Sequence, residues 1–144
     1  MKDRVFIDTN ILIYLYSEDE PEKQAIALDT ITDGQVERII STQVVGEFVN
    51  VLSRKFQFDP GSIKAAVDDF KGHFGIALIE IDTIEQALDI MKQYRFSFWD
   101  SMIISSAMEN DCSILYSEDL QDSQIHLGQL KIINPFALID APGL

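Results

Sequence analysis

Short apolar runs alternate with longer helical segments along this chain, and this alternation constrains the fold more than any other feature. Runs such as RVFI, RIIS and IALIEI are typical of buried strands, and the stretches between them have apolar residues at helical spacing. Strands that alternate with helices form βαβ units, because parallel strands need crossover connections. The sequence therefore predicts an α/β fold: three layers, α/β/α, around a mostly parallel central sheet of 4–5 strands.

The individual elements follow from the same pattern and from the residues that begin and end helices. We expect strands at Arg4–Ile7, Arg38–Ser41, Ile76–Ile81, Ser113–Tyr116 and Lys131–Ile133. We expect helices at Asn10–Tyr16, from Pro21 to Gly34, at Gln43–Phe56, from Pro60 toward Phe74, from Thr83 through Tyr94, and from Phe98 to Asn110. Thr83 and Gln86 have the spacing of a capping box. No repeat or linker interrupts the pattern, so residues 1–144 are predicted to form one domain.

The composition is that of a globular protein, with 47% hydrophobic and 24% charged residues. No apolar run approaches the roughly 20 residues that span a bilayer, so we expect no membrane association. Cys112 is the only cysteine, which rules out an internal disulfide and makes a reducing cytoplasm the simplest location. The acidic sequence before Cys112 favours an inert, packed thiol over a catalytic one.

The net charge of −13 argues against binding nucleic acid through bulk electrostatics, which needs cations that neutralise phosphates. It does not exclude nucleic acid that is reached through bound metal ions. Several basic residues fall in the middle third of the chain, either as a positive patch or, as we favour, on solvated helix faces. They are Arg54, Lys55, Lys64, Lys71, Lys92 and Arg95.

The sequence Asp8-Thr9-Asn10 interrupts an apolar run at the end of the first predicted strand. These residue types also form turns, because Asp and Asn side chains bond their own backbone. A buried aspartate, however, is costly unless something stabilises its charge. In parallel sheets, ligands bind beyond the carboxyl ends of strands, which is where Asp8 lies.

Three further acids stand out by position. Glu47 lies on or beside the apolar face of its helix, without a cation three or four residues away. Asp100 heads the apolar stripe of the last predicted helix, where it could instead complete a capping box with Ser97. Asp119 follows a strand in a loop that also contains other acids, so a solvated loop is its simplest interpretation in isolation.

The four acids taken together favour a common function. The expected topology brings Asp8, Glu47, Asp100 and Asp119 toward one edge of the sheet. Clustered carboxylates raise one another's pKa values, and divalent cations between them relieve that repulsion. Mg²⁺ and Mn²⁺ prefer carboxylate oxygens, and no His or Cys cluster indicates zinc. Such a cluster suits hydrolysis at phosphorus by a metal-activated water.

The segments that carry these acids resemble a known family. FIDTNIL, STQVVGEF, FWDSMIISSAMEND and ILYSEDLQD, in this order, look like the four signature blocks of PIN-domain nucleases, and most closely of VapC-type toxins from bacterial toxin–antitoxin pairs. The NPF near the end of the chain also resembles the sequence that often closes members of this subgroup. The resemblance covers nearly the whole chain and implies a PIN-like fold.

The resemblance also implies an activity, a Mg²⁺- or Mn²⁺-dependent endoribonuclease. By motif position, Asp8 and Asp100 would be the principal metal-binding and catalytic acids, Glu47 the third and Asp119 the fourth, with Asp122 able to assist or replace it. Thr9, Asn10 and Ser117 occupy the polar positions that orient those acids or a metal-bound water. The family further implies an RNA substrate, a homodimer and a cognate antitoxin that covers the acidic site.

Three other functions are compatible with some of these features. An aspartate-based phosphatase would want a second acid at position 10, where this chain has Asn10. A phosphate-accepting receiver domain would need an acid such as Asp82 at a strand terminus and a lysine at another, but Lys131 precedes its strand. A catalytically inactive PIN fold used for binding is disfavoured because all four acids are present.

Overall fold

The computed structural model describes residues 3–120 and 126–137, and these form a six-stranded sheet with helices on both faces. The strands are β1 (Arg4–Ile7), β2 (Glu37–Ser41), β3 (Gly75–Ala77), β4 (Ile114–Tyr116), β5 (His126–Leu127) and β6 (Leu130–Ile133). The helices are α1 (Thr9–Tyr14), α2 (Pro21–Thr32), α3 (Thr42–Arg54), α4 (Pro60–His73), α5 (Ile81–Tyr94) and α6 (Phe98–Glu109).

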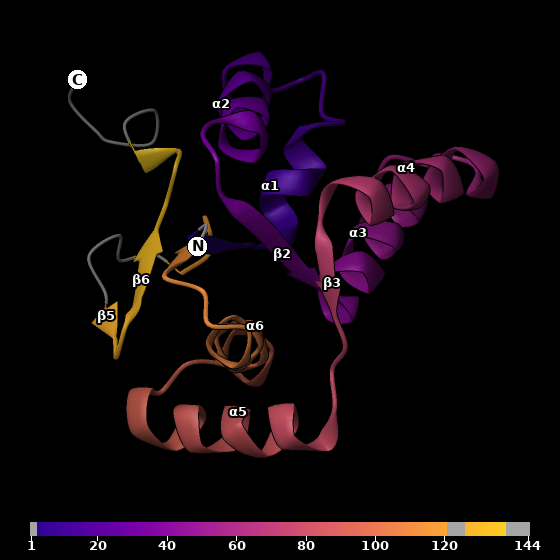
Figure 1. The fold of residues 1–144 in the computed structure, drawn as a ribbon. Helices are drawn as coiled ribbons and strands as arrows, with labels where there is room; N and C mark the ends of the chain where they lie inside the picture. The colour runs from indigo at the N-terminus through magenta and orange to yellow at the C-terminus, as the bar shows by residue number, and fades with distance from the viewer. Residues whose placement is uncertain (1–2, 121–125, 138–144) are drawn as a thin grey trace.

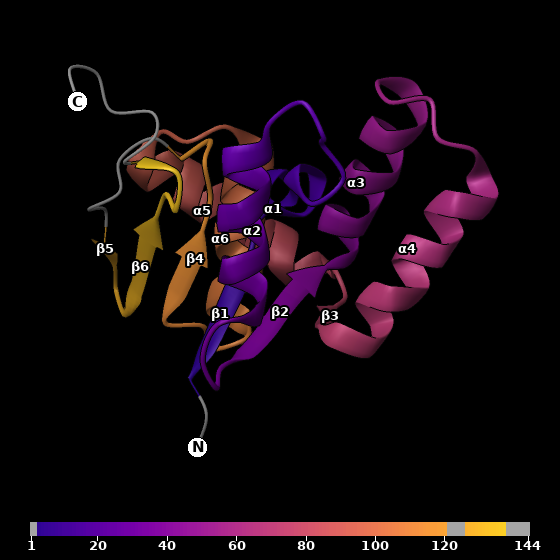
Figure 2. The same cartoon turned by 90° about the horizontal axis from the view of Figure 1, so that it is seen from above.

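The strands lie in the order β3-β2-β1-β4-β6-β5, and all adjacent pairs are parallel except β5 with β6. The predicted mostly parallel sheet is therefore confirmed. The antiparallel β5 is one strand more than the sequence predicted, because two residues are too short to give a pattern. Figure 2 shows β2, β4 and β6 pointing the same way.

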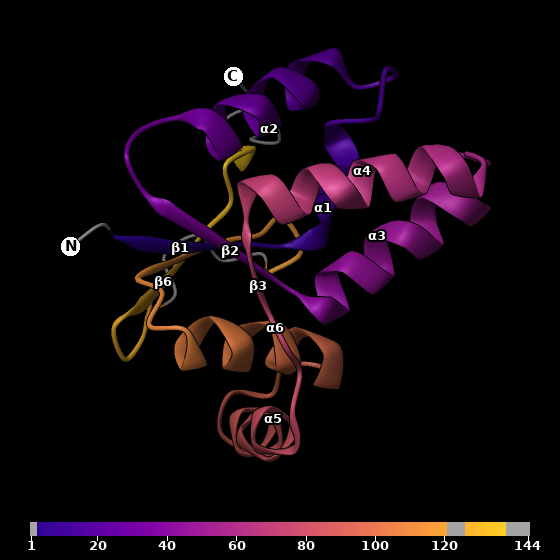
Figure 3. The same ribbon diagram turned by 45° about the vertical axis from the view of Figure 1, so that its right-hand side comes forward.

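Helices cover both faces of the sheet, which confirms the three-layer architecture. Figure 1 and Figure 3 show α1 and α2 on one face, and α6 on the other with α5 outside it. The pair α3 and α4 lies beside the β2–β3 side of the sheet. Because α6 is enclosed between the sheet and α5, every residue from Ser101 to Ala107 is buried, and its apolar residues are not confined to one stripe.

The third predicted strand and the following helix start are corrected by the structure. β3 ends at Ala77, opposite Ser41, because β2 gives way to α3 there and no strand remains to pair with residues 78–81. The helix α5 begins at Ile81, and its capping box joins Glu80 to Thr83 instead of Thr83 to Gln86. The Gln86 side chain instead accepts a hydrogen bond from Ser105 Oγ at 2.8 Å.

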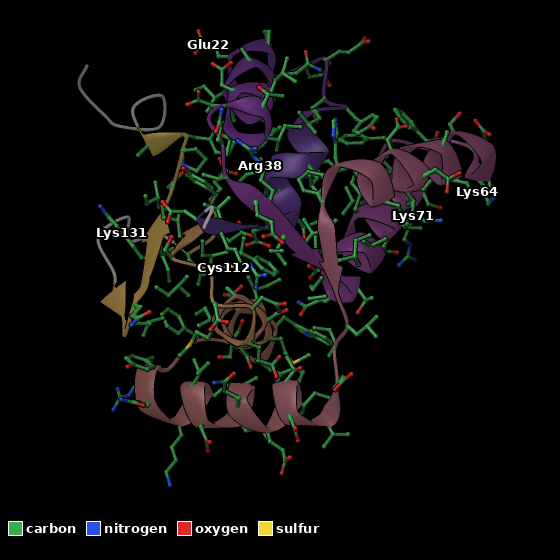
Figure 4. The ribbon with its side chains drawn as sticks, in the orientation of Figure 1. Glu22, Arg38, Lys64, Lys71, Cys112 and Lys131 are labelled. Carbon is green, nitrogen blue, oxygen red and sulfur yellow. The ribbon has the colours of Figure 1, made fainter. Side chains whose placement is uncertain are left out.

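The structure also places the single cysteine and the basic residues that the sequence singled out. Burial raises the pKa of the Cys112 thiol to about 12, so this cysteine is inert, as predicted. The six basic residues of the middle third are all exposed, and they lie on or at the ends of α3, α4 and α5. Figure 4 shows Lys64 and Lys71 on α4, far from Lys131 on β6. None of the helices in the described ranges combines the length and the apolar composition that a membrane span needs.

Candidate active site

The strand order places a crevice next to the end of β1. The chain adds β2 and β3 on one side of β1 and then returns to add β4 on the other side. Parallel sheets bind ligands at such a switch point, beyond the carboxyl ends of the two strands. Asp8 follows β1 and Ser117 follows β4, and the Asp8 N–H donates to the carbonyl of Tyr116 at 3.0 Å. The two strand ends are therefore held together where a site is expected.

Asp8 is the buried acid of this crevice, with 6% of its surface exposed. It is the N-cap of α1, and its Oδ1 accepts a hydrogen bond from the Thr9 N–H at 2.7 Å. Its Oδ2 accepts one from the Ser117 hydroxyl, also at 2.7 Å. The turn interpretation and the functional interpretation of Asp8 thus coexist, because one oxygen caps the helix while the other faces β4.

The charge of Asp8 is not neutralised by these neutral donors. Burial is the largest cause that raises the pKa of Asp8, from 3.8 to about 6. The hydrogen bonds from Ser117 and Thr9 lower it, and the charges of Glu47 and Asp119 raise it further. The predicted mutual repulsion of the acids is therefore present at Asp8.

Glu47 reaches the same crevice from α3. The Thr9 hydroxyl donates to Glu47 Oε1 at 2.7 Å, so Thr9 touches one acid through its side chain and another through its backbone. Helix α3 begins directly after β2, with Ser41 as its N-cap, which turns the Glu47 side of the helix toward the ends of the neighbouring strands. Val44 and Phe48 on the same helix are fully buried, as the apolar spacing predicted.

Asp100 enters from the first turn of α6. Ser97 is the N-cap, and its hydroxyl accepts a hydrogen bond from the Asp100 N–H at 3.1 Å. The cap therefore uses the Asp100 backbone, and the carboxylate lies in the lining of the crevice. Capping by Ser97 fixes where the helix starts and thereby where the carboxylate is presented.

Asp119 lies two residues beyond Ser117 and is more exposed than Asp8. Burial raises its pKa, a hydrogen bond with Asn10 lowers it, and the charges of Asp100 and Glu118 raise it. Asn10 thus contacts one of the four acids, as Ser117 does, whereas Thr9 contacts two. Asp122, the alternative fourth acid, lies outside the described residues.

The four acids line one cavity of about 130 Å³. Beside Asp8, Glu47, Asp100 and Asp119, the lining comprises Thr9, Asn10, Ile13, Gln43, Val51, Trp99 and Ile103. Of the apolar members, Ile103 of α6 belongs to the buried core and Ile13 of α1 packs against it, whereas Trp99 of α6 is 60% exposed. Gln43 and Trp99 were not singled out in the sequence. The Gln43 amide donates to the Trp99 carbonyl at 3.3 Å, a contact between α3 and α6 that no sequence pattern indicates.

The chemistry of this donor set fits hard divalent cations. Among the described residues, none of the four acids forms an ion pair with a lysine, arginine or histidine. Within the described ranges, no group of three or more acidic, histidine or cysteine side chains is placed to hold a metal ion directly. Mg²⁺ commonly binds through one or two carboxylates and keeps several waters, so a partial set of carboxylates suits it.

Glu118 is the neighbouring acid that the structure separates from the cavity. It lies between Ser117 and Asp119, yet its carboxylate contacts Lys23 and Tyr14 instead of the other four acids. Asp82, the acid that a receiver domain would need at a strand terminus, lies in the first turn of α5. The structure therefore gives no support to the receiver interpretation.

The order of the sequence motifs, the sheet and the acidic cavity together define a family. A family model described as PIN domain matches residues 5–125. The chain belongs to the PIN domain family, and the predicted resemblance is confirmed. No curated protein sequence matches the chain significantly.

Solved structures with the same fold include toxins of bacterial toxin–antitoxin pairs. VapC20 of Mycobacterium tuberculosis, a Sarcin-Ricin loop cleaving toxin, is similar with a TM-score of 0.68 at 18% identity, over 81% of this chain and 91% of that chain. A toxin–antitoxin complex from Klebsiella pneumoniae has a TM-score of 0.68 at 21% identity, over 91% and 97%. VapBC2 of Rickettsia felis, bound to a DNA fragment from its promoter, has a TM-score of 0.63 at 15% identity, over 91% and 98%.

Proposed function

We propose that this protein is a Mg²⁺- or Mn²⁺-dependent endoribonuclease and the toxin of a VapBC-type toxin–antitoxin pair. One observation carries the proposal: carboxylates from four separate segments line one cavity without a cation partner among the described residues. A fold gains nothing from such an arrangement, since the acids repel one another and Asp8 loses hydration. Its membership of the PIN domain family and its likeness to toxin structures agree with a nuclease.

The residues of the cavity divide into two roles. Asp8, Glu47, Asp100 and Asp119 would hold the ion, one or two of them directly and the others through its bound waters, because carboxylate and water oxygens are the ligands that Mg²⁺ and Mn²⁺ prefer. Thr9, Asn10 and Ser117 are positioning residues, since each bonds at least one of these acids and restricts its orientation. Such partners of metal-binding side chains fix ligand geometry.

The bound ion would supply an activated water and positive charge at the phosphate. It would also offset the repulsion between RNA and a protein with a net charge of −13. The protein's own contribution is to keep the carboxylates ionised, separated and oriented. Asp8 and Ser117, which come from adjacent strands, form the most buried part of this arrangement.

The proposed partners are an antitoxin and a second copy of the chain. The similar structures from Klebsiella pneumoniae and Rickettsia felis are toxin–antitoxin assemblies, which supports an antitoxin partner here. We propose that this antitoxin covers the acidic cavity and that the toxin is a homodimer. Co-expression with the neighbouring gene product and light scattering of the purified complex test both points.

The activity is tested by incubating the purified protein with single-stranded RNA. We expect cleavage with Mg²⁺ or Mn²⁺ and none with EDTA. Asp8→Asn and Asp100→Asn should each lower the rate by about 10³-fold or more, the size expected when an electrostatic group at the reacting centre is lost. Asp68→Asn, an exposed acid on α4, is the matched control and should keep the rate.

The result would contradict the proposal if cleavage persisted in both Asp8→Asn and Asp100→Asn. A wild-type protein that binds RNA but cleaves no RNA with either ion would indicate an inactive PIN fold. Circular dichroism of each variant separates loss of activity from loss of structure.

A further inference from the structure

The segment after β4 sends consecutive side chains in different directions. Ser117 contacts Asp8 and Asp119 lines the cavity, whereas Glu118 between them contacts α1 and α2. Ser117 is fully buried and Leu120 is 3% exposed, and the Leu120 N–H donates to Ser117 Oγ at 3.4 Å. Of these four residues, only Asp119 is solvent-exposed.

Glu118 is held by two donors that use both of its oxygens. Lys23 of α2 donates to Glu118 Oε2 at 2.7 Å, and the side chains of this ion pair are 16% and 17% exposed. The Tyr14 hydroxyl of α1 donates to Glu118 Oε1 at 2.6 Å. Lys23 also donates to the Tyr14 hydroxyl at 3.3 Å, which closes a triangle of hydrogen bonds among the three side chains.

Two aromatic rings support this triangle. The Lys23 ammonium lies 5.0 Å from the centre of the Tyr14 ring and 5.7 Å from that of Phe136, distances at which a cation is attracted to the ring face. Tyr14 and Phe136 pack edge to face, 5.0 Å apart, and Phe136 is fully buried. We call Tyr14, Lys23, Glu118 and Phe136 the clamp.

We propose that the clamp is a positioning device for the acidic cavity: by fixing Glu118 outside it, the clamp orients Ser117 and Asp119 into it. This inference rests on the proposed function, because it concerns how the carboxylates meet an ion. Lys23, Tyr14 and Glu118 are positioning residues and touch neither ion nor substrate.

The arrangement on both sides of Glu118 supports a role beyond stability. A carboxylate adjacent to Asp119 would compete with it for a cation if the segment turned over. Lys23 and Tyr14 occupy both Glu118 oxygens and so prevent this exchange. On the cavity side, Asn10 is the one side-chain hydrogen-bond partner of Asp119 among the described residues, so its orientation depends on the backbone of the clamped residue next to it.

Mn²⁺ binding to the intact protein tests the proposal without a cleavage assay. We expect Lys23→Met to raise the Mn²⁺ dissociation constant, measured by calorimetry or by electron paramagnetic resonance, about tenfold, the lower limit for losing an outer partner of a metal ligand. Lys23→Arg, which keeps the charge, should restore binding. Tyr14→Phe, which keeps the ring, should weaken it about threefold, as for one lost hydrogen bond. Lys71→Met on α4 is the control and should bind as the wild type does.

The outcomes separate this inference from the proposed function. If Asp8→Asn loses Mn²⁺ binding while Lys23→Met and Tyr14→Phe bind as tightly as the wild type, the clamp has no positioning role. If Asp8→Asn itself binds Mn²⁺ like the wild type, the proposed metal site is wrong, and the inference falls with it. Should Lys23→Met fail to fold, Tyr14→Phe decides: unchanged binding in that variant overturns the proposal.

Discussion

Asp8 and Glu118 are both carboxylates on segments that follow adjacent parallel strands, yet the protein treats them in opposite ways. Asp8 accepts only neutral donors, lies near other acids and has a pKa raised to about 6. Glu118 accepts a charged lysine and a tyrosine hydroxyl. The hydrogen bond between Lys23 and Glu118 is the largest cause that raises the pKa of Lys23 above its usual range.

The difference separates an acid whose charge the fold satisfies from one whose charge it leaves uncompensated. A mostly buried carboxylate is tolerated in a stable protein when a cation and hydrogen bonds satisfy it, as at Glu118. The charge of Asp8 is left uncompensated at a cost in stability, and such a cost is typical of functional sites. Substitutions at Lys23, Asp8 and Lys71 measure this difference.

The clamp should fail most severely when its cation is removed. Lys23→Met leaves Glu118 mostly buried beside Tyr14 with no opposing charge, and we expect the free energy of unfolding to fall by about 3 kcal/mol. Urea denaturation followed by circular dichroism measures this loss. In a Glu118→Gln background the same substitution should cost clearly less, and equal costs in both backgrounds would show that the two side chains are not coupled.

Removing the charge of Asp8 should have the opposite effect and raise the free energy of unfolding. The folded protein keeps the Asp8 proton up to about pH 6 and the unfolded chain only to about 3.8, so stability falls as pH rises between these values and stays lower above them. This difference corresponds to about 3 kcal/mol at neutral pH, and the substitution Asp8→Asn removes it. The Asn side chain has one acceptor oxygen and cannot accept hydrogen bonds from both Thr9 and Ser117. The variant therefore loses about 1 kcal/mol of stability at this position.

We therefore expect Asp8→Asn to unfold at higher urea concentration than the wild type at pH 7.5, by about 2 kcal/mol. The gain should vanish near pH 4. Both proteins are measured in EDTA, since a bound divalent ion would offset the repulsion only in the wild type. A variant less stable than the wild type at pH 7.5 would show that Asp8 serves the fold, as Glu118 does.

An exposed ion pair should give the smallest change in the free energy of unfolding. Lys71 and Asp68 on α4 approach to 3.8 Å, and their side chains are 67% and 56% exposed. Water and salt screen such a pair, so Lys71→Met should change the free energy of unfolding by less than about 0.5 kcal/mol. A larger change, measured in the same urea experiment, would mean that exposure does not explain the contrast with Lys23.

Much of the fold could be predicted because local patterns agree with the tertiary structure. The strand at Arg4–Ile7 has the predicted bounds, and Pro21 and Pro60 begin their helices as expected. The end of β3 could not be predicted, because the apolar run continues after Ala77. The strand stops there because its neighbour stops at Ser41, and pairing between distant segments is invisible in a local pattern.

The candidate site likewise combines features that local patterns predict with features that depend on contacts between distant segments. Unusual position identified Asp8, Glu47 and Asp100, because an acid at a strand end or beside an apolar helix face departs from the pattern around it. Position could not separate Glu118 from Asp119, since both follow the same strand. Their roles differ through Lys23 and Tyr14, which lie about a hundred residues earlier in the chain.

The edges of the sheet limit how other molecules can dock. In the sheet that the described residues form, one edge is the three-residue β3 and the other is the two-residue β5. Such short edges offer few free backbone groups, and this discourages an extended peptide from joining as another strand. Recognition of this protein by another chain should therefore proceed through side chains on its helices and loops, not through β-augmentation.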